Sequence, residues 1–108
     1  MTDLFTQLVD EALAEIPAEF QRHLDNVAIV IEEEPSGPLL GMYHGSTMRY
    51  RDFPGKQPDI IRFYRGPMLR HYGHDPDVLA REVRRLVRHE VAHHFGISDA
   101  RLLELDRY

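Results

Sequence analysis

Apolar residues in the first part of the chain recur every three or four positions, which is the spacing of one face of a helix. The series is Leu4, Phe5, Leu8, Val9, Ala12, Leu13 and Ile16. It predicts a packing helix over residues 1–20, and Asp3 can cap its N-terminus. Because proline has no amide hydrogen, we expect a break in this helix near Pro17.

Three short segments have the composition of strands, with turn residues between them. Residues 27–31 are apolar on both faces, which predicts a central or covered strand. Residues 39–44 and 60–65 predict two more strands, with Gly41 as a bulge or a point of close approach. The acidic run at residues 32–34 is typical of a solvated strand end, and the alternative is an acidic rim that selects a basic substrate.

The last third of the chain predicts a long helix over residues 76–95, after a single helical turn over residues 68–72. Asp75 is a favoured N-cap, and Pro76 suits the first helical position. The apolar stripe of the long helix consists of Leu79, Val83, Leu86, Val87, Val91 and Phe95.

Titratable side chains crowd this stripe near the end of the helix. Glu90 and His94 fall within it, and His89 and His93 lie on its edge. Because buried polar groups are costly unless they are paired, a bound metal would explain the crowding. His94 is offset by one residue from the ligand spacing, so we expect it to donate to a backbone carbonyl or to a carboxylate beside the metal.

The segment His89-Glu90-Val91-Ala92-His93 has the pattern H-E-x-x-H. On a helix, His89 and His93 lie one turn apart on the same face, so two imidazoles can reach one zinc ion. Glu90 then lies near the metal, where a general base for hydrolysis must be. The alternative is an amphipathic helix whose polar face carries His and Glu by chance.

A catalytic zinc site usually has three protein ligands, so the two histidines require a partner. Asp99 is the candidate, because Gly96 would let the chain turn sharply after the helix. Asp99 can instead cap a short helix over residues 98–103. The other candidates for the third ligand are Glu104, Asp106, His71 and His74.

The pattern H-E-x-x-H-x-x-G-x-x-D over residues 89–99 resembles the zincin metallopeptidases, in the variant where an aspartate replaces a third histidine. The chain resembles more closely the small bacterial zincin-like metallopeptidases known as minimal zincins. The resembling segments are residues 39–43, 59–65 and 89–103.

The resemblance implies that His89, His93 and Asp99 hold one Zn²⁺ per chain and that Glu90 is the catalytic base. Metzincins also carry a methionine turn beneath the metal, well after the third ligand. Only nine residues follow Asp99 here, and none of them is methionine. This departure favours metal binding over efficient proteolysis.

Composition and charge narrow the range of possible functions further. A chain of 108 residues is expected to form a single domain over residues 1–108. The net charge of -5 argues against nucleic-acid binding, which needs a clustered basic surface. The chain has no cysteine for disulfides or a Cys-type zinc site, and no apolar run long enough to span a membrane. Without a signal-peptide pattern, we expect a cytoplasmic protein.

Together these features predict an α+β, zincin-like fold. The first helix and the HExxH helix should pack on one face of a small mixed sheet of three or more strands, with a short C-terminal helix. The expected function is zinc-dependent peptide hydrolysis, with the peptide added to an edge strand at residues 39–44 or 60–65. Arg49, Tyr50 or Arg51 could stabilise the oxyanion.

Two other functions are compatible with the sequence. In the first, the domain binds metal and recognises a peptide or protein partner without turnover. In the second, the motif is structural and the chain is a plain interaction domain. We expect a monomer, with a dimer as the alternative.

Overall fold

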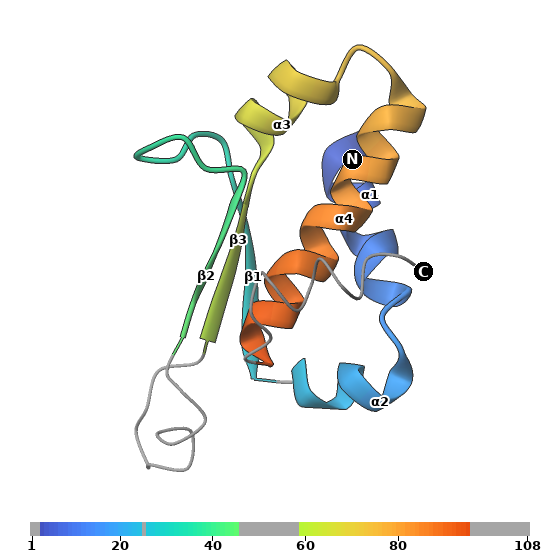
Figure 1. Cartoon of the computed structure of the whole chain (residues 1–108), viewed down its shortest axis with the longest axis vertical. Helices are drawn as coiled ribbons and strands as arrows, with labels where there is room; N and C mark the ends of the chain where they lie inside the picture. Colours follow the sequence, from blue (N-terminus) through green and yellow to red (C-terminus); the bar gives the residue numbers. More distant parts are fainter. Residues whose placement is uncertain (1–2, 25, 46–58, 96–108) are drawn as a thin grey trace.

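The computed structural model describes residues 3–24, 26–45 and 59–95 (Figure 1). The elements in order are α1 (Leu4–Ala14), α2 (Ala18–Gln21), a short 3-10 turn (Arg22–Leu24), β1 (Val27–Glu32), β2 (Gly41–His44), β3 (Asp59–Tyr64), α3 (Arg65–Tyr72) and α4 (Pro76–His94). The short helix predicted over residues 98–103 lies outside the described residues. None of the helices in the described part of the chain is long and apolar enough to cross a membrane.

The first helix, α1, begins where the sequence predicts and ends at Ala14, three residues before Pro17. The Asp3 carboxylate accepts a hydrogen bond from the Thr6 amide at 2.9 Å, which is the expected N-cap. The helix stops at Ala14, and Pro17 begins a separate short helix, α2. The helix predicted over residues 1–20 is therefore interrupted near Pro17, as the sequence predicts, because proline cannot continue the hydrogen-bond ladder.

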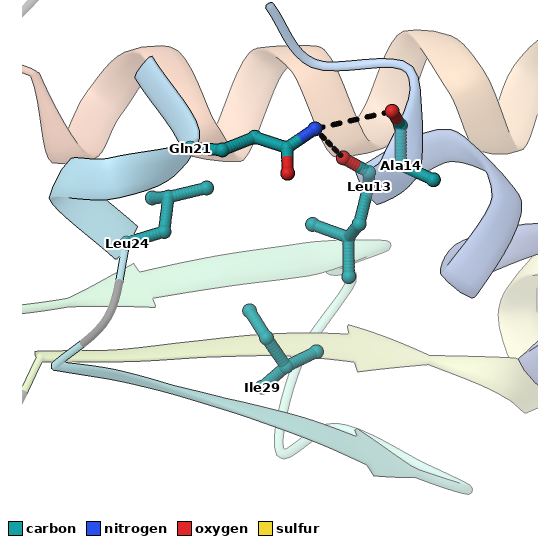
Figure 2. Close-up of a pocket in the computed structure, with 5 residues that line it drawn as sticks. All are labelled: Leu13, Ala14, Gln21, Leu24 and Ile29. Atoms are coloured by element: carbon teal, nitrogen blue, oxygen red, sulfur yellow. Dashed lines mark hydrogen bonds between the residues drawn. The ribbon is translucent and has the colours of Figure 1, made fainter. Parts of the chain in front are cut away.

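Gln21 of α2 stabilises the end of α1. Its side-chain amide donates to the carbonyl oxygens of Leu13 at 3.4 Å, Ala14 at 3.1 Å and Ile16 at 2.6 Å. Helix C-termini leave carbonyls without partners inside the helix, and this amide supplies one. Figure 2 shows Gln21 above an apolar hollow between α1, α2 and β1, where Ile29 lies.

The sheet has the order β1-β3-β2, so the last of the three described strands in the sequence is the central one. β3 pairs parallel with β1 and antiparallel with β2, which confirms the predicted mixed sheet. Residues 27–31 were predicted to form a central or covered strand; in the structure β1 lies at an edge of the described sheet, and Ile29 is 36% exposed. Apolar, β-branched composition does not by itself separate an edge strand from a central one.

The core lies between the sheet and the helices on one of its faces, as predicted for α1 and α4 (Figure 1). From β3 the fully buried side chains are Ile61 and Phe63, and from α1 they are Phe5 and Val9. The α4 stripe adds Leu79, Val83, Val87 and Val91. Burial of this apolar surface is the main force that holds α4, and the motif on it, against the sheet.

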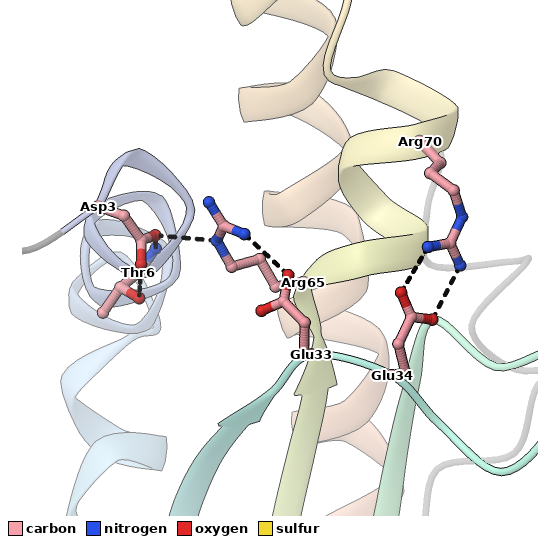
Figure 3. A network of polar contacts seen from close by, with 6 residues as sticks. All are labelled: Asp3, Thr6, Glu33, Glu34, Arg65 and Arg70. Atoms are coloured by element: carbon pink, nitrogen blue, oxygen red, sulfur yellow. Dashed lines mark hydrogen bonds and ion pairs between the residues drawn. The ribbon is translucent and has the colours of Figure 1, made fainter.

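Three arginines pair with the acidic run at the end of β1, and Figure 3 shows the two pairs formed by Glu33 and Glu34. The pairs are Glu32 with Arg62, Glu33 with Arg65, and Glu34 with Arg70. The Arg70 guanidinium lowers the pKa of the Glu34 carboxyl by donating hydrogen bonds to it. The Glu33 and Glu34 side chains are 64% and 54% exposed, as expected of a solvated strand end, and their ion pairs link the end of β1 to the β3–α3 segment.

Contacts between the end of β1 and the β3–α3 segment also explain why α3 is longer than the predicted turn over residues 68–72. α3 begins at Arg65, directly after β3, and the Gly66 amide donates to the Glu33 carbonyl at 2.8 Å. A Cβ on Gly66 would lie 2.6 Å from that carbonyl oxygen, so only glycine allows this approach. Pro67 is tolerated in the first turn, where its missing N–H has no helical acceptor.

Candidate metal centre

α4 carries the HExxH motif in its last two turns. The helix begins at Pro76, and the Asp75 carboxylate accepts from the amides of Asp77 at 2.9 Å and Val78 at 3.4 Å. It continues unbroken for 19 residues to His94. The local signals for its start and the regular apolar spacing thus place the motif on a helix, as the sequence predicts.

His89, Glu90 and His93 converge where the buried and exposed faces of this helix meet. One ligand atom from each of the three residues lies within 4.8 Å of the others. The two imidazole centroids are 4.5 Å apart, and His93 Nδ1 lies 3.7 Å from Glu90 Oε1. Two imidazoles with a carboxylate form a donor set that zinc and similar divalent ions accept, so this group can hold a metal.

The two kinds of side chain in this group differ in burial. Glu90 is buried, whereas the His93 side chain is 30% exposed and His89 is half-buried. The imidazoles can therefore meet a ligand from solvent, whereas Glu90 is shielded from bulk water and lies close to Gly41 of β2.

Gly41 of β2 makes room for Glu90. A Cβ at Gly41 would lie 3.1 Å from Leu86 Cδ1, 3.2 Å from the Arg62 carbonyl oxygen and 3.4 Å from Glu90 Cγ. The sequence predicted a bulge or a close approach at this glycine, and the close approach is what the structure has. The edge strand β2 can consequently lie directly against the part of α4 that carries the motif.

A buried polar network ties the end of α4 to the sheet. His94 Nδ1 lies 2.8 Å from Asp59 Oδ2, and the Tyr43 hydroxyl donates to the same oxygen at 2.7 Å. Asp59 and His94 are both buried, with relative exposures of 5% and 4%. His94 thus contacts a carboxylate, one of the two partners expected from the sequence, whereas the metal-binding group contains the preceding histidine, His93.

Asp59 was not among the residues expected near the site. Its one signal in the sequence is an acidic residue at the start of an otherwise apolar strand, which a buried partner would explain. Asp99, Arg49, Tyr50 and Arg51 lie outside the described residues. Within the described ranges, the metal-binding group does not include His71 or His74.

A groove of about 440 Å³ begins at the metal-binding group. His89 and Glu90 line one end, and residues 38–41, at the start of β2, line one side. Side chains of α3 and of the middle of α4 form the remainder. The group is therefore open to a ligand considerably larger than water.

Comparisons with known proteins identify the family of this chain. The chain is similar to a conserved hypothetical protein from T. thermophilus, at 26% identity and a TM-score of 0.58, over 85% of this chain and 91% of that one. No curated protein matches the chain. Residues 24–108 match the model of a family described as zincin-like metallopeptidase, and this segment contains the sheet, the groove and the HExxH helix. The chain belongs to the zincin-like metallopeptidase family.

Proposed function

We propose that this protein is a zinc-dependent peptidase. The observation that carries the proposal is the convergence of His89, Glu90 and His93 within 4.8 Å at the end of an open groove. Membership of the zincin-like metallopeptidase family supports the same chemistry. His89 and His93 would hold the ion, and we propose Asp99 as the third ligand.

Glu90 is the proton carrier in this proposal. When bound, zinc supplies Lewis acidity that activates water and polarises the scissile carbonyl. The Glu90 carboxylate accepts the proton of the attacking water and passes it to the leaving amine. Its contact with β2 through Gly41 restricts the carboxylate to the metal side of the helix. Arg49, Tyr50 and Arg51 are the proposed candidates for the oxyanion contact.

The topology selects β2 as the strand for substrate pairing. Of the two strands proposed from the sequence, the one at residues 60–65 is excluded, because β3 is central and pairs on both sides. The Tyr64 amide donates to the Leu40 carbonyl at 3.0 Å, so Leu40 turns its backbone groups toward β3. Along an antiparallel ladder this orientation alternates, so Gly41 and Tyr43 turn theirs toward the outer edge.

An extended peptide could pair with that edge by strand addition. The edge runs past Glu90, since Gly41 lies against its side chain. A peptide paired with Gly41 would place its backbone beside the metal group, where an amide bond is hydrolysed. No strand among the described residues occupies the outer edge of β2.

The test combines metal content with hydrolysis. We expect purified protein to bind one zinc per chain in calorimetric titration and to cleave members of a diverse peptide library. Glu90→Gln should retain zinc and lose about 10²–10⁴-fold in rate, because glutamine cannot accept the proton. The proposal would be refuted if Glu90→Gln cleaved peptides at the wild-type rate. It would also be refuted if His89→Ala and His93→Ala both bound zinc as well as the wild-type protein does.

A further inference from the structure

The groove beside the metal group has an apolar wall built from three parts of the chain. Leu39 and Leu40 precede β2, Met68 and Tyr72 come from α3, and Leu86 comes from α4. Met68 is almost fully buried, whereas Leu39 is 39% exposed, so the apolar surface continues from the floor to the rim. A side chain placed there would lose apolar surface to water on several sides, which favours binding.

Charged side chains of both signs lie on the α4 side of the groove. Glu82 lines the groove with its side chain only 14% exposed, and Arg85 lies beside it with 60% exposed. Arg85 Nη1 is 3.9 Å from Glu82 Oε2, and Arg81 Nε is 3.5 Å from Glu82 Oε1. Of these three residues only Glu82 and Arg85 line the groove, and their opposite charges partly cancel there.

The backbone geometry places a peptide side chain at this wall. Gly41 lines the groove and has its backbone groups directed to the outer edge of β2. Residues directly opposite each other in an antiparallel pair have side chains on the same face of the sheet. The residue opposite Gly41 therefore directs its side chain to the α4 face, where the groove and Glu90 lie.

We propose that this groove is the specificity site of the peptidase and takes an uncharged apolar side chain, such as leucine or phenylalanine. That side chain belongs to a residue next to the reacting bond, because His89 and Glu90 line the same groove. The inference rests on the proposed function, since it names the substrate class of that same metal site. It adds that residues 39–40, Met68, Tyr72 and Leu86 select the substrate.

Binding can be measured without turnover in zinc-loaded Glu90→Gln protein. The probes are fluorescein-labelled, alanine-based peptides of one length that carry Leu, Phe, Ala, Lys or Glu at a single scanned position. Fluorescence anisotropy gives the affinity of each. At one position we expect Leu and Phe to bind about tenfold or more tightly than Ala, Lys and Glu, as hydrophobic pockets discriminate on this scale.

Two matched substitutions locate this preference. Leu39→Ser changes an exposed leucine on the groove wall, and Leu4→Ser changes a leucine that is 51% exposed on α1. We expect Leu39→Ser to abolish the preference for Leu over Ala and Leu4→Ser to retain it. Because the chain has no tryptophan, Leu39→Trp also gives a single fluorescent reporter that should respond to the Leu peptide, whereas Leu4→Trp should not. Melting curves of each variant confirm folding.

The outcomes separate this inference from the proposed function. Absence of peptide binding, equal affinity for all scanned side chains, or a leucine preference that survives in Leu39→Ser would overturn the groove assignment. Hydrolysis by wild-type protein that ignores the scanned side chain would overturn it too, while leaving the peptidase proposal intact. A preference that depends on Leu39, without hydrolysis of any peptide, would support the groove and refute the peptidase.

Discussion

The buried contact between Asp59 and the end of α4 makes a strong prediction about stability. Asp59 Oδ2 accepts from the Tyr43 hydroxyl at 2.7 Å and lies 2.8 Å from His94 Nδ1. Asp59→Ala would remove the acceptor from two neighbours at once. Removing one partner of a buried hydrogen bond typically costs about 1–3 kcal/mol, because the other partner stays desolvated.

That loss is large beside the total stability of a small domain, which is about 5–15 kcal/mol. Asp59→Asn is therefore the more informative change, because it keeps the shape of the side chain and one acceptor oxygen. A hydrogen bond to a charged group contributes about 1.5–3 kcal/mol, so we expect a loss of that order. Tyr43→Phe removes a single hydroxyl and should cost less than Asp59→Asn.

Chemical denaturation of metal-free protein measures these differences as shifts of the midpoint at constant slope. Asp10→Asn on the exposed side of α1 is the control, and it should stay within about 0.5 kcal/mol of wild type. The double variant of Tyr43→Phe and Asp59→Asn should be less destabilised than the sum of the singles, since both changes affect the same hydrogen bond. If Asp59→Asn were as stable as wild type, the network would not hold α4 to the sheet.

Three other predictions address the site and the helix caps. Gly41→Ala should lower the unfolding free energy by about 1–3 kcal/mol, because the added methyl group overpacks against Leu86 and Glu90. Thermal melting measures this loss, and an unchanged melting temperature would contradict the close approach. Asp99→Ser should sharply lower zinc affinity in calorimetry while the metal-free protein keeps its melting temperature, whereas unchanged affinity would remove Asp99 from the site. Asp3→Ala should cost about 0.5–2 kcal/mol near neutral pH by loss of the N-cap. Because the Thr6 amide lowers the pKa of Asp3 below 3.8, its contribution is present above that pH and is lost as the pH falls through the lower folded-state value. Denaturation curves should show that the difference in unfolding free energy between wild type and Asp3→Ala becomes smaller as the pH falls over that range.

The amino-acid sequence by itself determined the features of this protein that depend on near neighbours. Asp75 and Pro76 mark the start of α4, and the helical repeat then places His89 and His93 one turn apart. These relations need only the backbone geometry of one helix, so they can be inferred before any tertiary contact is known. The same holds for the Asp3 cap, which acts three residues along the chain.

Only the tertiary structure decided which strand is central and what surrounds the metal group. β1 and β3 have similar apolar content, and their order depends on pairing between residues far apart in the sequence. Asp59 meets His94 across 35 positions, and Gly41 meets Glu90 through packing of β2 on α4. Such contacts depend on how the elements pack in three dimensions, and hydrophobic burial, which drives that packing, is non-directional. Local sequence patterns therefore do not specify which polar groups the packing brings together.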